Sequence, residues 1–229
     1  LALCLCTLED ELFGTLSNDE EFEKKASYLA RLGSGSACRS IFSKAALWGE
    51  TIGITNSSNL YAIGWGHHLH PVFSSFHDDI LTISKEEKSV SSTVGHSLMD
   101  NNPYAETRYM SVDTRMRKLI SILKSGDVEG FGALVEQEAY SLHGLMMLSE
   151  PPYLLIKPNT VAAIEQLTTW RQSQKVPLYF TLDAGPNLQL LYPDEYATKV
   201  QSFIHNELLK YCAGGEYIPD KVGEGPRQL

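Results

Sequence analysis

The sequence predicts an α+β fold built from layered helices and antiparallel strand pairs. Segments with apolar residues at every third or fourth position alternate with short apolar strands. The strands come in neighbouring pairs joined by short polar turns, which is typical of hairpins and disfavours a parallel doubly wound sheet. With 229 residues, of which 43% are hydrophobic, the chain can bury a core without a metal or a disulfide.

The first part of the chain is expected to hold two helices, a short third helix and a hairpin. Residues 1–8 are apolar or small and read as the middle of a buried helix, too short to cross a bilayer. Asn18 can cap an acidic first turn, and apolar residues then recur at helical spacing up to Gly33, after which a short helix is expected. The expected hairpin strands are residues 45–54 and 59–65.

The second part alternates helices with another strand pair. Residues 78–84 are expected to form a strand, and the charged residues 85–88 follow it. We place a domain boundary there, which gives domains 1–87 and 88–229. Beyond it we expect helices carrying residues 109–123, 131–146 and 164–170 (capped by Asn159 or Thr160), strands 178–182 and 188–192, and a last helix over 193–209.

Charge and cysteine content limit the partners of this protein. Lys and Arg number 19 against 28 Asp and Glu, for a net charge of −9, so neither nucleic acid nor an anionic membrane is an expected partner. An anionic ligand therefore needs a local site. The four cysteines, at positions 4, 6, 38 and 212, match no zinc motif, and no signal peptide is visible. We expect free thiols and a cytoplasmic protein.

Residues Gly33–Arg39 are the first candidate site. Two glycines, two serine hydroxyls and the start of a helix place several donors in a small volume. Arg39 adds a bidentate cation, and the combination suits a phosphate or a carboxylate. The alternative is an interhelix loop whose serines only cap the next helix.

Asp183 is the second candidate. It ends an apolar strand and precedes a Gly-Pro turn, so a rigid element would hold its carboxylate for work as a general base. The alternative is an Asx turn, in which the side chain bonds its own backbone.

Two further polar segments carry groups that could bind a ligand or a metal. Residues Ser91–Gly95, with Ser92 among them, form a hydroxyl-rich helix start that could contact a ligand or only cap the helix. His67, His68 and His70 lie in a loop without Glu or Cys at ligand spacing, so no protein metal site is expected. Other histidines, namely His96, His143 and His205, read as ordinary helix residues.

The motifs together resemble the diphosphomevalonate decarboxylase family of the GHMP kinase superfamily. The matching segments are ARLGSGSACRS (30–40), VSSTVG (90–95) and FTLDAGPN (180–187), in the family's order and at its distances. Residues 222–226 resemble that family's last strand. The resemblance implies an incomplete N-terminal part similar to ribosomal protein S5 domain 2 and a ferredoxin-like α/β-sandwich C-terminal domain.

This resemblance implies an ATP-dependent decarboxylation of mevalonate 5-diphosphate to isopentenyl diphosphate. Asp183 matches the catalytic aspartate that orients or deprotonates the 3-hydroxyl group, and Arg39 matches the arginine that holds the substrate carboxylate. Mg²⁺ is expected to enter with ATP, bound through the phosphates. A homodimer is compatible with the resemblance. The substrate contacts that it implies are Ser34, Gly35, Ser36, Ser92 and Arg39.

The sequence also departs from the family pattern. His96 stands where the family often has Met, and Thr93 stands where some members carry Arg. The family's lysine-bearing strand and ATP phosphate loop have no counterpart here, so an N-terminal truncation is expected.

Two alternative functions therefore stay open beside the decarboxylase. One is a mevalonate or phosphomevalonate 3-kinase or decarboxylase variant, and the other is a truncated, non-catalytic anion-binding domain. We also expect Gly33–Arg39 and Asp183 to come from different domains and to face one cleft.

Overall fold

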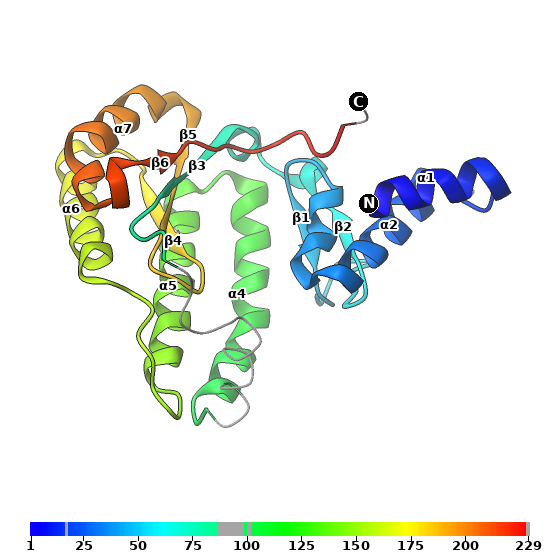
Figure 1. The fold of residues 1–229 in the computed structure, drawn as a ribbon, viewed down its shortest axis with the longest axis horizontal. Coiled ribbons are helices and arrows are strands. Elements are labelled where there is room, and N and C mark those ends of the chain that lie inside the picture. Colours follow the sequence, from blue (N-terminus) through cyan, green and yellow to red (C-terminus); the bar gives the residue numbers. More distant parts are fainter. Residues whose placement is uncertain (17, 87–98, 100–101, 228–229) are drawn as a thin grey trace. The chain divides into compact units, whose positions relative to one another are not determined.

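The computed structural model describes residues 1–16, 18–86, 99 and 102–227 (Figure 1). These residues form two compact units. The first unit holds Leu1–His70 and the C-terminal residues from Val222, and the second holds Pro71–Lys221. The boundary expected between residues 87 and 88 falls at a segment outside the described residues, and that division into domains stays a prediction.

Two helices open the first unit. Helix α1 (Ala2–Phe13) packs on α2 (Asp19–Gly33), and an ion pair between Glu9 and Lys25 joins them. The helix expected at the start of the chain is confirmed, but the prediction that it is buried is wrong. Of the residues in α1 only Cys6 is buried, because this side faces α2 while the leucines lie on the other sides of the helix.

The end of α2 and the hairpin follow the sequence pattern closely. Asn18 caps α2 by accepting a hydrogen bond from the Glu21 amide at 2.9 Å. A 3-10 helix, Gly35–Ile41, comes directly after it. Strands β1 (Ala46–Trp48) and β2 (Ala62–Gly64) pair antiparallel, as expected, but are shorter than the apolar segments. The residues between them close a loop through the Ser57 hydroxyl, which accepts from the Thr51 amide at 2.9 Å, instead of extending the ladder.

A four-stranded antiparallel sheet forms the centre of the second unit. Its strands are β3 (Phe76–Leu81), β4 (Tyr179–Leu182), β5 (Leu188–Pro193) and β6 (Tyr217–Ile218), in the order β4-β5-β3-β6. The β4–β5 hairpin confirms the expected strand pair, with Leu182 opposite Leu188 at its closed end. Strand β3 lies between β5 and β6, although more than a hundred residues separate it from either along the chain.

Four α-helices among the described residues complete this unit. They are α4 (Ala105–Ser125), α5 (Val128–Met147), α6 (Pro158–Gln174) and α7 (Ala197–Phe203). Helix α4 ends at Gly126, whose φ of 81° lies in the left-handed region that glycine adopts without strain. The last helix is expected to run to residue 209, but after α7 it continues as a π-helical turn, Ile204–Leu208, and a 3-10 turn, Leu209–Tyr211.

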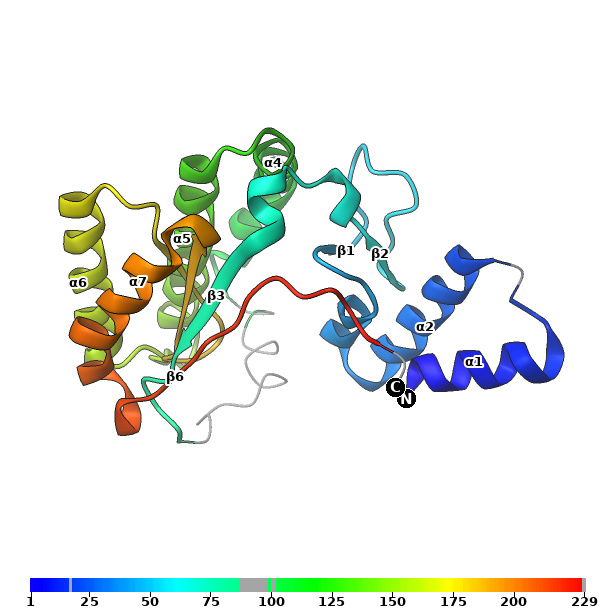
Figure 2. The ribbon, with the colours of Figure 1, turned by 90° about the horizontal axis from the view of Figure 1, so that it is seen from above.

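The hydrophobic core lies between the sheet, α6 and α7. Leu167 of α6 and Val200 of α7 pack onto the sheet face that carries Leu81, Phe180 and Leu190, and each of these side chains is at most 1% exposed. Figure 2 shows α6 and α7 next to each other beside the sheet. Helix α5 packs along β4, the strand at the edge of this sheet.

The chain leaves the sheet at its C-terminal end. The strand expected at residues 222–226 is absent, since among the described residues the last strand is β6 and residues 222–227 have no regular structure. The Lys44 amide instead donates a single hydrogen bond to the Gly223 carbonyl at 2.8 Å. No helix within the described part of the chain is long and apolar enough to cross a lipid bilayer.

Candidate active site

Asp183 lies at the closed end of the β4–β5 hairpin. The strand residues on both sides of this turn, Leu182 and Leu188, are buried, whereas Asp183 is exposed. The Gly185 amide donates to the Asp183 carbonyl at 2.6 Å and closes a tight turn. The hairpin therefore presents this carboxylate to solvent from a turn that is anchored on either side in the core.

A histidine of α5 reaches the same turn. The Nε2 atom of His143 lies 3.1 Å from the Asp183 carbonyl oxygen, and the histidine is only 4% exposed. Burial lowers the pKa of the imidazole, although the contact with the Asp183 carbonyl opposes this shift. His143 is thus not the ordinary helix residue that the sequence indicated.

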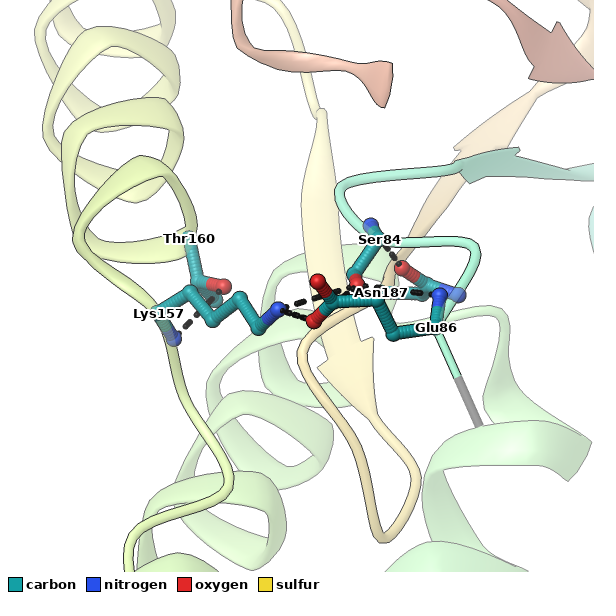
Figure 3. A network of polar contacts seen from close by, with 5 residues as sticks. All are labelled: Ser84, Glu86, Lys157, Thr160 and Asn187. Atoms are coloured by element: carbon teal, nitrogen blue, oxygen red, sulfur yellow. Dashed lines mark hydrogen bonds and ion pairs between the residues drawn. The ribbon is translucent and has the colours of Figure 1, made fainter. Parts of the chain in front are cut away.

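The far end of the turn is tied to α6 and to the segment after β3 (Figure 3). The fully buried Thr160 hydroxyl donates to the Pro186 carbonyl at 2.8 Å and accepts from the Lys157 amide at 3.2 Å. The Asn187 side-chain oxygen accepts from the Ser84 amide at 2.9 Å. The expected N-cap of α6 is corrected here, because the helix begins at Pro158 and Thr160 lies within its first turn.

A charged contact borders this network. The Lys157 ammonium donates to the Ser84 hydroxyl at 3.0 Å and forms an ion pair with Glu86 (Figure 3). This ammonium lowers the pKa of Glu86. Residues from α5, from α6 and from the segment after β3 thus hold one short turn, and this is the arrangement expected of a preorganised site.

The second candidate segment lies in the first unit. Ser34, Gly35, Ser36 and Arg39 are all exposed at the start of the 3-10 helix and along it. Cys38, between them, is fully buried, and its carbonyl accepts from the Ser27 hydroxyl at 2.9 Å. The segment is therefore fixed on its inner side and presents the predicted ligand-binding side chains to solvent.

Gly35 lies close to the side chain of Trp48. A Cβ atom on this residue would lie 3.2 Å from the indole of Trp48. That indole is itself held by a hydrogen bond from its Nε1 atom to the Asn59 carbonyl at 3.1 Å.

The remaining sequence candidates are accounted for as follows. Ser92 and the rest of Ser91–Gly95 lie outside the described residues. Arg39 and Asp183 belong to different units, and the cleft that they are expected to share stays a prediction. Among the residues that the structure describes, no three His, Cys, Asp or Glu side chains form a group that could hold a metal ion.

Comparison with known proteins places this chain in a family. Residues 80–228 match the family model of the mevalonate 5-diphosphate decarboxylase C-terminal domain. Because this match covers more than half of the chain, the chain belongs to the mevalonate 5-diphosphate decarboxylase family.

Individual relatives agree with this assignment. Diphosphomevalonate decarboxylase of Ganoderma lucidum is 27% identical over 206 residues, which cover 86% of this chain and 49% of the relative. The enzyme of the same name from Danio rerio is 28% identical over 209 residues, which cover 85% of this chain and 50% of the relative. The chain spans about half the length of the curated relatives it matches.

Solved structures confirm the α+β, GHMP-kinase-like fold. A mevalonate diphosphate decarboxylase from Staphylococcus aureus superposes with a TM-score of 0.79 at 24% identity, over 98% of this chain and 64% of that one. A structure described as MDDEF in complex with MVAPP superposes with a TM-score of 0.74 at 25% identity, over 89% of this chain and 61% of that chain.

The sequence did contain a signal for the histidine contact. His143 lies four residues after Ala139 and three before Met146, and both of these are buried in α5. This spacing places the imidazole on the buried side of the helix, where a polar group needs a hydrogen-bond partner. The identity of that partner depends on how α5 packs along β4, and that packing leaves no local sequence pattern.

Proposed function

We propose that the full-length polypeptide that carries this chain is an ATP-dependent decarboxylase of mevalonate 5-diphosphate. The products are isopentenyl diphosphate, ADP, phosphate and CO2. The observation that carries the proposal is the exposed Asp183 carboxylate on a turn held by buried partners from α5 and α6. Membership of the decarboxylase family supports it.

The proposed reaction needs a general base and a cationic residue that binds the substrate carboxylate. Asp183 accepts the proton of the tertiary 3-hydroxyl group while the oxygen of that group attacks the γ-phosphorus of ATP and ADP leaves. The C–O bond to the new phosphate then breaks, and the C–C bond to the carboxylate breaks with it. The electron pair of that C–C bond forms the double bond, and CO2 departs. Arg39 holds the carboxylate through the planar fork of its guanidinium until that step.

Ser34, Gly35, Ser36 and Ser92 supply the further substrate contacts in this proposal. Backbone and hydroxyl donors near Arg39 suit a diphosphate beside a carboxylate.

Mg²⁺ enters with the nucleotide. A related structure is described as MDDEF in complex with MVAPP, AMPPCP and magnesium, which supports this part of the proposal. Among the described residues no three His, Cys, Asp or Glu side chains form a group that could hold a metal ion. In this proposal phosphate oxygens and water therefore hold the Mg²⁺ ion. When bound, the ion neutralises charge on the phosphates.

The proposal also includes a cytoplasmic location and a homodimeric assembly. All four cysteines are free thiols, which supports a cytoplasmic, reducing environment. A homodimer stays a prediction that sedimentation of the full-length polypeptide tests.

Replacing Asp183 by Asn tests the central step. The change keeps the size and the turn-forming amide oxygen but removes the base. Turnover is expected to fall by about 10²–10⁴-fold with little change in KM. If Asp183→Asn instead turns over normally and only loses stability, the Asx-turn alternative is correct and the proposed function of this residue is wrong.

Substrate assays separate the alternative functions. CO2 release with mevalonate, its monophosphate and its diphosphate distinguishes the decarboxylase from a 3-kinase that only phosphorylates. Calorimetry with ATP tests for a non-catalytic anion-binding domain, which is expected to bind the nucleotide only weakly.

A further inference from the structure

We propose that His143 is a positioning residue for the catalytic carboxylate, and that it acts through the backbone carbonyl of Asp183. This inference rests on the proposed function and adds to it a residue of α5 that does not itself touch the substrate. The role follows from three features of the site: the hydrogen bond, the burial of the imidazole and the attachment of the turn.

The hydrogen bond holds the peptide group after Asp183, which is one of the two peptide groups that set the direction of the Asp183 side chain. Its carbonyl accepts from the Gly185 amide at 2.6 Å and faces His143 Nε2 at 3.1 Å. The first contact lies within the turn and moves with it. The second comes from a helix of 20 residues, so it ties the turn to an element outside the hairpin.

Burial makes this contact costly to lose. His143 is 4% exposed, so water cannot easily replace the Asp183 carbonyl as the hydrogen-bond partner of the imidazole if the bond breaks. In the neutral imidazole, donation to a carbonyl requires the proton on Nε2. Burial keeps the pKa of this imidazole low and so favours the neutral form.

Two further contacts hold the other end of the turn. Thr160 holds the Pro186 carbonyl at 2.8 Å, and the Ser84 amide holds the Asn187 side chain at 2.9 Å. Both act on the β5 side of the turn, three or four residues after Asp183. Loss of the His143 contact removes the hydrogen bond that links this peptide group to α5, while the Thr160 and Ser84 contacts still hold the β5 side of the turn. An error of about 1 Å in the position of a catalytic group can cost about 10²-fold in rate.

Two substitutions of His143 separate its hydrogen bond from its volume. The amide nitrogen of Gln extends about as far as Nε2 of His, so His143→Gln keeps a donor for the Asp183 carbonyl. His143→Met fills similar space without a donor. Ser149→Ala is the matched control, because its buried hydroxyl bonds the Met146 and Pro151 carbonyls at the end of α5.

The full-length polypeptide is assayed for kcat, for KM of mevalonate 5-diphosphate and ATP, and for thermal unfolding. We expect His143→Met to lower kcat by about 10–100-fold with both KM values within about twofold, and His143→Gln to stay within about threefold of the parent. Ser149→Ala is expected to lose stability and keep kcat. Equal kcat in His143→Met and the parent overturns the inference, as does a Gln variant that is no better than Met.

Asp183→Asn, assayed beside these variants, keeps the two proposals apart. If it lowers turnover while His143→Met does not, only the positioning role is wrong. If it leaves turnover unchanged, the proposed base is wrong and the positioning role falls with it.

A measurement on the unsubstituted protein covers the case in which His143→Met does not fold. Nitrogen chemical shifts of a ¹⁵N-histidine sample, assigned with His143→Gln, report which ring nitrogen carries the proton. We expect the Nε2-protonated tautomer at neutral pH. A proton on Nδ1 alone excludes donation to Asp183 and overturns the inference.

Discussion

The hydroxyl of Thr160 donates to the Pro186 carbonyl at 2.8 Å and thereby joins the first turn of α6 to the β4–β5 hairpin. Thr160 is fully buried, and its oxygen also accepts from the Lys157 amide at 3.2 Å. One side chain thus satisfies two backbone groups of distant segments. By contrast, the exposed Thr169 of the same helix donates to the carbonyl of Glu165, four residues earlier, at 2.9 Å.

Replacing Thr160 by Val is therefore expected to destabilise the fold. The change keeps the shape and removes the hydroxyl, so the Pro186 carbonyl and the Lys157 amide lose their partner. The free energy of unfolding should fall by about 1–3 kcal/mol in a urea titration. Thr169→Val is the control and should change it by less than about 0.5 kcal/mol. Equal effects of the two changes would show that the link to Pro186 contributes nothing.

Arg39→Lys tests the anion site of the first unit. The substitution keeps the charge but loses the planar fork that binds a carboxylate through two hydrogen bonds. Because Arg39 is exposed, folding should not change. We expect kcat/KM for mevalonate 5-diphosphate to fall by about 10–100-fold, the value of charge-assisted hydrogen bonds. Arg31→Lys, which alters a guanidinium bonded to the Leu60 carbonyl, should leave kcat/KM unchanged. A parent-like Arg39→Lys enzyme would show that Arg39 does not hold the substrate carboxylate.

The sequence predicted the helices and hairpins well because each depends on neighbouring residues. The Asn18 cap, the break at Gly126 and the β4–β5 turn are local signals, and the structure confirms them. Long-range pairing leaves no such signal. The place of β3 between β5 and β6 depends on residues more than a hundred positions away. The strand expected at 222–226 was inferred from resemblance alone, and the structure contains no strand there.

The candidate site shows the same division. Asp183 could be selected from its place after an apolar strand, because strand and turn are local patterns. The residues that bind the turn could not be predicted from the sequence, since His143, Thr160 and Ser84 come from three separate segments. The exposure of α1 was also mispredicted, because an apolar segment does not specify which element will cover it.

Asp78 provides a pH-dependent prediction. Burial, with the charges of Asp220 and Asp79 nearby, raises its pKa from 3.8 to about 6. A carboxyl group whose pKa is higher in the folded state than in the unfolded state contributes its full stabilisation at a pH below its unfolded-state pKa. This contribution is lost as the pH rises through its folded-state pKa. Asp78→Asn should therefore match the parent near pH 3.5 and become more stable by about 1–3 kcal/mol at pH 7.

Urea unfolding of both proteins from pH 3.5 to pH 7 measures this difference. Asp113→Asn, an exposed position of α4, is the control and should change the free energy of unfolding by less than about 0.5 kcal/mol. A difference between Asp78→Asn and its parent that stays constant with pH would contradict the raised pKa.

Two glycines of α5 give opposite predictions for one substitution. A Cβ atom on Gly132 would lie 2.0 Å from the ring of Tyr179. That ring is 8% exposed and lies under the Arg171 guanidinium, 5.0 Å from the ring centroid, so it cannot easily move away. A Cβ atom on Gly144 meets nothing within 4 Å. Gly132→Ala should therefore lower the free energy of unfolding by about 1–3 kcal/mol through overpacking.

Gly144→Ala should raise the same free energy by about 0.5–1 kcal/mol, because alanine loses less backbone freedom than glycine on entering a helix. Both variants are compared by urea unfolding, with the slope of each transition checked so that only stability differs. Helix propensity alone would make both changes stabilising. A stabilising Gly132→Ala would therefore show that α5 does not approach β4 as closely as the Tyr179 contact requires, and would place in question the packing that brings His143 to Asp183.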